Sequence, residues 1–452
     1  MTSVQNLLRQ LSGNKVILLS ILCLFLVSSC KTKKTVVDNK GPRTQTPNTN
    51  RPGPKSKVDT IRWSESVLEN SDVVTTETPI EYKSSYKIAI LIPFESNRYE
   101  PRQFQIQESN ENRFANYYSG VKLALEKLNT EGANFSVQVI DSGVGNISPK
   151  LNKLKEYDLI IGPYNRQQLK ETAEFCLKNE IVNISPWQAS SKIAEDNPFH
   201  VQLRPNQTAY YDAMVEHALR KYDVEQIWLV GRDTKTDKGR INYFQESAAA
   251  ILNKPKGVLN EYEIDLDSLT NEALTYNNIF VEDKKNVFLF PQWSSEDEPF
   301  LYDCLRKLAI EKGSNDLIVY GMPVMIDSDK ISYDYFQNLD IHVTRAKWVD
   351  RHDPDVKAFR KYYFDRYNAL AQDDALDGYD MMMFVGSNLM KDGKTFQYTL
   401  DQDRERYLQT SFDIQKVVLS DEERLDNFNK IDYFENRNLD IIRFRKDRLV
   451  RD

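Results

Sequence analysis

The residues of this sequence that could do chemistry follow short apolar runs, in two successive series along the chain. If the runs are strands of open α/β sheets, these residues lie at the carboxyl ends of the strands, where such sheets bind ligands. Helix N-termini at the same edge offer free backbone N–H groups to anions. The candidate binding residues are Phe94, Tyr164, Asn165, Ser185, Trp187, Thr234, Gln292, Trp293 and Asp327.

Some of these candidates have an equally simple structural interpretation. Asp327 precedes Lys330 in a segment where it could be a helix N-cap instead of a partner for a ligand's ammonium group. Trp187 and Trp293 could face each other across a cleft, or each could pack locally on a surface. Asp380, in Gly-Tyr-Asp, favours a structural role in bonding the backbone.

The sequence gives little support for catalysis. It has no G-x-S-x-G segment and no phosphate-binding Walker loop, and its four histidines show no metal-ligand spacing such as H-E-x-x-H. The acidic runs 296–298 and 373–374 have the pattern of exposed charge, and Ser190-Ser191 before Lys192 has no second motif to support a nucleophile. We therefore expect a protein that is not an enzyme and has no cofactor and no catalytic metal.

The chain is long enough for two or three lobes, and the charge pattern argues against nucleic acid as a partner. It has 452 residues and a net charge of −7, with both signs interspersed. If residues 1–29 are cleaved off as an export signal, as described below, Arg9 and Lys15 are lost and no acidic residue is. The net charge then changes from −7 to −9.

Alternating apolar runs and helical patterns begin at Tyr86 and predict βαβ units in parallel sheets. A polar segment at 95–113 interrupts them as a long surface loop, and the alternation pauses at 200–205 before a second series begins. The expected strands are 87–93, 135–141, 159–162, 181–185, 226–231, 260–266, 285–290, 316–320 and 341–348. The expected helices are 117–128, 150–156, 167–178, 209–221, 242–252, 269–276 and 298–310.

The N-terminal segment has the features of an export signal. Lys15 precedes a short apolar run that ends in Leu-Val-Ser-Ser before Cys30, too short for a transmembrane helix of about 20 residues. Small residues followed by cysteine resemble the lipobox of bacterial lipoproteins, which implies cleavage after residue 29 and a lipid on Cys30. An ordinary signal peptide with an incidental cysteine is the alternative.

Residues 30–85 are expected to be a lipid anchor followed by a disordered tether, because 41–60 is rich in Pro, Gly, Asn, Thr and Lys. Cys23 would leave with the signal, so Cys176 and Cys304 remain. A disulfide is possible outside the cytoplasm, but the two residues lie in separate helix-like stretches, which favours two buried free thiols.

Several short motifs occur in the order typical of type I periplasmic binding proteins, the leucine/isoleucine/valine-binding family. They are the opening strand 88–93, the helix Gly120–Asn129, Asp141 at a strand end, the strand and Gly-Pro turn 160–163, the strand end 182–186, the lobe crossing 199–205, the helix pair 359–367 and 377–380, and the closing strand 441–447. Over about 360 residues the chain resembles this family.

The resemblance implies two doubly wound parallel-sheet lobes joined by a three-strand hinge. Lobe 1 would comprise 86–205 plus 352–395, and lobe 2 would comprise 206–351 plus 396–452 with the closing hinge segment. Closure on an amino-acid-like ligand is implied, with Asn165 and Ser185 holding its carboxylate, Trp187 as an apolar wall and Asp327 near its ammonium group.

Two functions remain open. The first is a lipid-anchored solute-binding protein that closes on a small polar ligand and serves an ABC permease. The alternative is an envelope scaffold or regulator of cell-wall synthesis with a protein partner, favoured by the long tether and the polar segment 95–113. Both place the chain in the cell envelope, as a lipoprotein of the outer membrane facing the periplasm.

Overall fold

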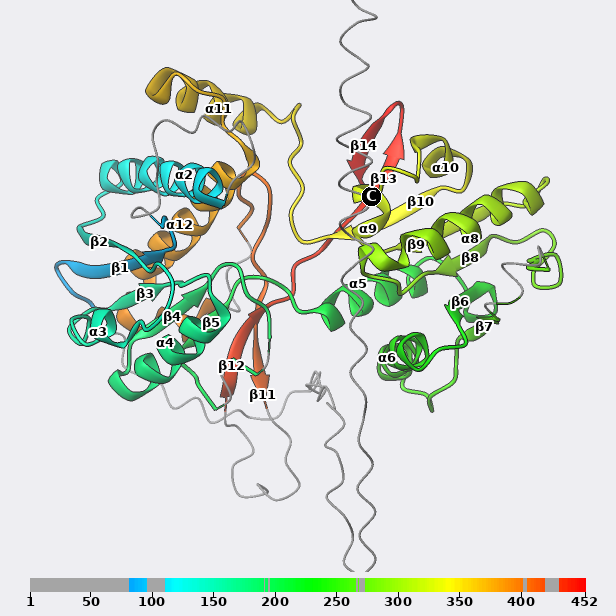
Figure 1. The fold of residues 1–452 in the computed structure, drawn as a ribbon, viewed down its shortest axis with the longest axis horizontal. Helices are drawn as coiled ribbons and strands as arrows, with labels where there is room; N and C mark the ends of the chain where they lie inside the picture. Colours follow the sequence, from blue (N-terminus) through cyan, green and yellow to red (C-terminus); the bar gives the residue numbers. More distant parts are fainter. Residues whose placement is uncertain are drawn as a thin grey trace, which may run out of the picture. The chain divides into compact units, whose positions relative to one another are not determined.

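The computed structural model describes residues 81–95, 110–190, 192–193, 196–265, 267, 273–400, 405–418 and 431–452. These residues form two seven-stranded sheets, each flanked by helices (Figure 1). We call each sheet with its helices a lobe. Cys30, the signal and the tether lie outside the described residues.

The first sheet is parallel except at one edge. Its strands are β1 (Tyr86–Ile92), β2 (Phe135–Asp141), β3 (Leu159–Ile161), β4 (Val182–Ser185), β5 (His200–Gln202), β11 (Ile414–Val418) and β12 (Ile431–Asn436). They run in the order β11-β12-β5-β4-β3-β1-β2, and only β11 and β12 pair antiparallel.

The helices of lobe 1 cover both faces of this sheet, as its apolar strands require. They are α2 (Asn110–Thr130), α3 (Ser148–Leu151), α4 (Arg166–Asn179), α11 (Pro354–Tyr367), α12 (Asp373–Asp392) and the 3₁₀ segment η4 (Gly393–Tyr398). In β1, Ile88 and Ile90 pack in the cluster with α2 and α12, whereas Ala89 and Leu91 pack with α3 and α4. Successive residues of a strand point to opposite faces, and this strand is buried on both.

Two glycines allow α2 and α12 to cross closely. A Cβ atom on Gly120 would lie 1.8 Å from the Ala375 carbonyl oxygen, and one on Gly378 would lie 2.0 Å from that of Tyr117. Gly378 belongs to the Gly-Tyr-Asp motif, so this part of the motif is explained by helix packing.

The second sheet has the same plan. Its strands are β6 (Ile227–Arg232), β7 (Asn260–Ile264), β8 (Asn286–Leu289), β9 (Leu317–Gly321), β10 (Ile341–Arg345), β13 (Asp440–Arg445) and β14 (Arg448–Arg451). The order is β14-β13-β10-β9-β8-β6-β7, with antiparallel pairing where β13 meets β10 and β14.

Helices cover both faces of this sheet as well. They are α5 (Gln207–Leu219), η2 (Val224–Gln226), α6 (Lys235–Leu252), η3 (Ser295–Asp297), α8 (Glu298–Glu311), α9 (Val324–Asp327) and α10 (Tyr333–Asn338). Phe288 of β8 packs in the cluster with α8 and α10, whereas Val287 and Leu289 pack in the cluster with α5 and α6. The fold class expected from the sequence, two α/β lobes with mostly parallel sheets, is confirmed.

The segment 396–452 was expected to belong to lobe 2 and the closing hinge, and the structure instead divides its strands between the two sheets. β11 and β12 lie in the first sheet, where Phe434 pairs with Val201 of β5. The chain therefore crosses between the sheets three times: after β5, after β10, and between β12 and β13. Only β13 and β14 of the closing segment belong to the second sheet.

Several helices begin or end at other residues than expected. The polar segment 95–113 is not loop to its end, because α2 already begins at Asn110. The helix expected at 150–156 is the single turn α3, which ends at Leu151, and the described part of 269–276, residues 273–276, is not helical.

Cys176 and Cys304 are both free and buried, one in each lobe, which confirms the expected free thiols. No described helix combines the length and apolar character that crossing a membrane requires.

Candidate functional site

The sequence predicts ligand contacts at the carboxyl ends of the lobe 1 strands. Trp187, which follows β4, makes several ring contacts at this edge of the sheet. Its side chain is almost fully buried, at 5% exposure. Its ring lies 5.6 Å from that of Phe114, 4.9 Å from that of Tyr117 and 5.9 Å from that of Tyr164, between ring centroids. Trp187 is therefore the centre of an aromatic cluster built from α2 and the strand-end loops, and not an open wall.

The other predicted aromatic residues of lobe 1 also pack against α2. Phe94 makes an edge contact with Tyr118 at 5.7 Å. Tyr164 lies edge-on to Phe114 at 5.1 Å, and the Arg113 guanidinium lies 5.8 Å from the Tyr164 ring. Rings that contact one another in this way contribute to lobe stability beyond their buried area.

The predicted polar residues of lobe 1 bond to their own backbone. Asn165 is the N-cap of α4, and its side-chain oxygen accepts the N–H groups of Gln167 and Gln168 at 3.0 and 3.2 Å. Ser185 is 1% exposed and donates its hydroxyl to the Gln188 carbonyl oxygen at 3.2 Å. Both side chains that were expected to bind a ligand's carboxylate therefore make hydrogen bonds to the nearby backbone instead.

A network of four charges occupies the corresponding edge of lobe 2. Arg232, at the end of β6, makes two bonds to Asp237 of α6, at 2.8 and 3.0 Å, and a third to Asp297. Arg240 bridges the same two carboxylates at 3.0 and 3.1 Å. Asp237 is fully buried and Asp297 is 4% exposed. The network joins β6, α6 and the segment after β8.

Hydrogen bonds keep these carboxylates ionised. Burial alone would raise the pKa of Asp237, but bonds from Arg232 and Gln292 outweigh it and hold that pKa below its usual value. Burial also opposes ionisation of Asp297, and backbone N–H bonds together with Arg232 again lower its pKa. The bond to Asp237 is the main reason that the pKa of Arg232 is raised. The cluster is thus a matched set of two positive and two negative charges.

Three predicted residues of lobe 2 serve this network or lie beside it. Thr234 caps α6 by accepting the Asp237 N–H at 3.2 Å. Gln292 is fully buried and donates to Asp237 at 3.0 Å and to the Val230 carbonyl at 3.2 Å. The backbone N–H of Trp293 donates to an Asp297 carboxylate oxygen at 3.1 Å.

The remaining candidates are separate. The Trp293 ring packs edge-on against Tyr210 at 4.7 Å, so among the described ring contacts the two tryptophans do not meet. Asp327 is the last residue of α9, not an N-cap, and its exposed carboxylate pairs with Arg345 at 2.7 Å.

Sequence reasoning missed the burial of Asp297. The run 296–298 has the composition of an exposed acidic turn. The signal that was present is Ser294, three residues earlier, which forms a capping box with Asp297. The adjacency of β6 and β8 brings Arg232 to this turn, and no local pattern indicates that pairing.

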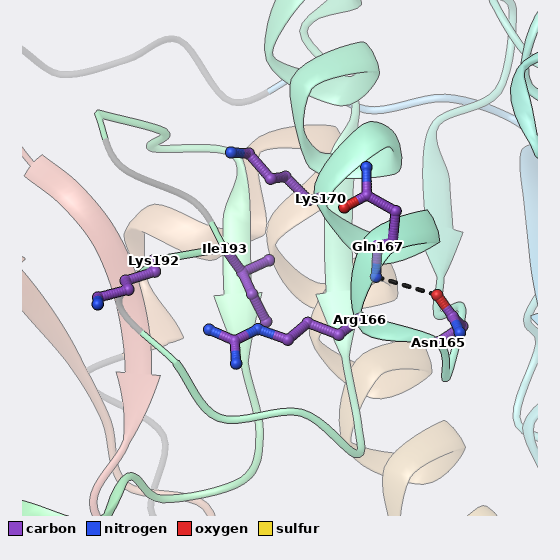
Figure 2. A pocket seen from close by; sticks show the side chains of 6 residues that line it. All are labelled: Asn165, Arg166, Gln167, Lys170, Lys192 and Ile193. Atoms are coloured by element: carbon purple, nitrogen blue, oxygen red, sulfur yellow. Dashed lines mark hydrogen bonds between the residues drawn. The ribbon is translucent and has the colours of Figure 1, made fainter. Parts of the chain in front are cut away.

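One hollow lies beside a predicted residue, at the start of α4 (Figure 2). It measures about 500 Å³. In Figure 2 its three cationic side chains do not converge on one point. The Arg166 guanidinium donates to the Ser190 hydroxyl at 3.0 Å. The hollow is basic and therefore suits an anion, but its cationic groups are not arranged around one binding position. The lining residues are Asn165, Arg166, Gln167, Lys170, Lys192 and Ile193.

Asp380 of the Gly-Tyr-Asp motif is structural, as its sequence context favours. It is 1% exposed and accepts the backbone N–H groups of Leu408 and Gln409 at 3.0 and 2.9 Å. Close by, Lys347 pairs with Asp377 at 2.6 Å. A space of about 20 Å³ beside these residues has room for about one water molecule.

Comparison with known proteins agrees with this fold. The family model described as the receptor family ligand binding region matches residues 105–387, which is more than half of the chain. The chain belongs to this family. Its members share the two-lobed type I periplasmic binding protein fold, and they bind ligands rather than catalyse reactions.

Solved structures of the same fold fall into two groups by their names. A candidate branched-chain amino acid ABC transporter protein of Rhodospirillum rubrum is 13% identical, with a TM-score of 0.51, over 81% of this chain and 100% of that one. An ABC transporter substrate-binding protein of Desulfitobacterium hafniense is 12% identical, with a TM-score of 0.50, over 81% of this chain and 100% of that one.

The second group contains a regulator. The C-domain of LpoA from Haemophilus influenzae, a regulator of PBP1A, is 11% identical, with a TM-score of 0.50, over 81% of this chain and 99% of that one. At these identities the likenesses establish the fold alone. No curated protein matches the chain.

Proposed function

We propose that this chain is a non-enzymatic protein of the bacterial cell envelope that uses the two-lobed fold as a scaffold or regulator of cell-wall synthesis, without enclosing a small solute. One observation carries the proposal: the side chains at the strand ends of both lobes are bonded to, or packed on, their own lobe. The partner would be a cell-wall synthesis protein that contacts the outer surface.

The energetics of the strand ends support this function. To offer its ring to a ligand, Trp187 must leave the aromatic cluster, which costs about 1.5–3 kcal/mol for a large buried side chain. To offer a charge, the lobe 2 network must lose one partner, which costs about 3–5 kcal/mol. Because each 1.4 kcal/mol is a factor of about ten in affinity, the first change weakens solute binding by roughly 10- to 100-fold and the second by roughly 100- to 4,000-fold.

The anchor belongs to the same proposal. A lipid on Cys30 and the polar tether that follows it would hold the lobes at a membrane, and we place that membrane as the outer membrane, with the lobes facing the periplasm. A tethered protein meets membrane-bound partners at a high effective concentration, which suits a regulator more than a carrier that diffuses between partners.

The second candidate is a solute-binding protein that serves an ABC permease. The basic hollow at the start of α4 favours it, because Asn165 lies there and cationic side chains attract a carboxylate or phosphate. The names of the Rhodospirillum and Desulfitobacterium structures also fit this candidate.

Cross-linking in intact cells separates the two candidates. The full chain would carry a photoreactive residue in place of exposed Tyr362 on α11 in one strain, and in place of exposed Ile310 on α8 in another. We expect a cross-link to a cell-wall synthesis protein, unchanged by excess amino acids. A cross-link to a permease component, or one that depends on an added solute, would support the second candidate instead.

The anchor is tested separately. We expect mass spectrometry of the protein isolated from cells to show a lipid on Cys30, and Cys30→Ser to abolish this modification. If the wild-type protein carries no lipid at Cys30, the lipid anchor is wrong.

A further inference from the structure

Two of the four histidines of the chain lie together in lobe 2, although 125 positions separate them in the sequence. His217 of α5 and His342 of β10 have ring centroids 6.0 Å apart. Asp452, which follows β14, completes the group, and its backbone N–H donates to the Ile441 carbonyl at 2.9 Å, which fixes its position. One donor atom from each of the three residues lies within 4.8 Å of the other two.

Two of the three donor–donor separations match those around a tetrahedral metal ion. Nε2 of His217 lies 3.2 Å, and Nδ1 of His342 lies 3.5 Å, from the same Asp452 oxygen, Oδ2. Ligands at about 2.0–2.1 Å from a tetrahedral zinc ion stand about 3.3 Å apart. Two imidazoles and one carboxylate are also a ligand set that suits zinc and related transition metals.

The outward-facing ring nitrogens have the partners that metal-bound histidines usually have. Nδ1 of His217 lies 2.8 Å from the Tyr320 hydroxyl. Nε2 of His342 lies 3.3 Å from an Asp340 carboxylate oxygen. Such outer groups fix the ring orientation and increase the basicity of the ligating nitrogen. Each histidine thus directs one nitrogen towards Asp452 and the other towards an outer oxygen.

His342 is the independent observation that points to a ligand. Its side chain is 1% exposed. Its Nδ1 lies close to Asp452 but without hydrogen-bond geometry, so this nitrogen is buried without a hydrogen-bond partner. Buried polar atoms in native proteins nearly always have a partner, and a bound cation would supply one for Nδ1.

We propose that His217, His342 and Asp452 bind one zinc ion, or a divalent transition metal of similar preference, within lobe 2, with a water molecule as the fourth ligand. The ion would join α5, β10 and the β13–β14 hairpin. The site includes none of the strand-end residues discussed above, and the proposal does not depend on the proposed function.

Two cationic side chains form ion pairs with Asp452, and one of them provides a test of the proposal. The Lys221 ammonium lies 2.5 Å from Oδ2, the oxygen that would bind the metal, and the Arg443 guanidinium lies 2.7 Å from Oδ1. The Lys221 side chain is 40% exposed and can turn into solvent. Lys221 therefore competes with the metal, whereas Arg443 orients the carboxylate.

The experiment is calorimetric titration of zinc chloride into the full chain, kept in detergent because of its apolar N-terminal segment and stripped with a chelator. We expect one zinc ion per chain, and with cobalt chloride the visible absorption of a four-coordinate site. His217→Gln and His342→Gln should each abolish binding. His352→Gln, at an exposed histidine outside the group, is the matched control and should leave binding unchanged.

Lys221→Gln keeps the proposal testable even if the buried variants fold poorly, because this side chain is partly exposed. Removing the competing charge should tighten zinc binding at least several-fold. The proposal is overturned if the wild-type chain binds no zinc, if binding persists in folded His217→Gln and His342→Gln variants, or if Lys221→Gln weakens it or leaves it unchanged.

Discussion

Asp380 gives the most quantitative prediction, because it is a carboxyl group buried at the point where α12 meets the segment that precedes β11. Burial raises its pKa to about 7, although the N–H groups of Gln409 and Leu408 act in the opposite direction. In the unfolded chain an aspartate has a pKa of about 3.9. The folded state therefore binds a proton more tightly than the unfolded state does.

The sign and size of the effect follow from linkage. The stability that this proton contributes is fully present below the unfolded pKa, and it is lost as pH rises through about 7. Between pH 6 and pH 8 the loss is about 1.4 kcal/mol, since the unfolded group is ionised throughout this range and one pKa unit is worth about 1.36 kcal/mol.

The test is urea unfolding of the full chain and of Asp380→Asn at pH 6, 7 and 8. Asparagine cannot ionise, so the free energy of unfolding of the wild type relative to the variant should fall by about 1.4 kcal/mol from pH 6 to pH 8. Contributions from His200 and His217, whose pKa values burial lowers to about 4, are the same in both proteins and cancel.

Asp365→Asn, at a side chain that is 54% exposed, is the control and should show no such change with pH. The raised pKa of Asp380 would be refuted if the free energy of unfolding of the wild type, relative to that of Asp380→Asn, stayed constant or increased from pH 6 to pH 8.

Three further predictions concern packing and charge, and thermal or urea unfolding measures each. Asp237→Ala leaves two partly buried arginines with one carboxylate and should cost about 3–5 kcal/mol, whereas Asp327→Ala at an exposed pair should cost less than about 1 kcal/mol; equal costs would contradict a stabilising role of the network. Gly378→Ala places a Cβ 2.0 Å from a carbonyl oxygen and should destabilise strongly, whereas Gly239→Ala in α6 meets nothing within 4 Å and should stabilise by about 0.4–1 kcal/mol; a neutral Gly378→Ala would argue against the close helix crossing. Trp187→Ala should cost about 3–5 kcal/mol as a buried ring; a cost below 1 kcal/mol would mean that the ring is free to contact a ligand.

The strands and helices of the two series were predictable because each carries its own local pattern. The continuous apolar run of β1 indicates burial on both faces, and the helical spacing of α2 and α8 indicates one buried stripe. β11 and β12 were assigned to the wrong lobe because nothing local indicates their partner. β12 pairs with β5 more than 200 residues earlier, and the third chain crossing that permits this pairing leaves no signal in composition.

The ligand contacts predicted at the strand ends stay a prediction, but the structure shows what these side chains contact. The sequence indicated the strand ends, and the structure places Thr234 and Gln292 around one carboxylate, Asp237. It could not indicate that Trp187 turns into a cluster with α2, because that contact depends on how the helix packs on the sheet. For the same reason, no spacing rule brought His217 and His342 together.

Calorimetric titration of the full chain with each amino acid and with cell-wall fragments tests the central claim most directly. The claim is that the strand-end residues hold one another and not a solute. We expect no amino acid to bind the wild-type chain with micromolar affinity or better. The double variant Ser185→Ala and Asn165→Ala should give the same titration as the wild type. Tight binding of any amino acid that this double variant abolishes would contradict the claim and establish the chain as a solute-binding protein.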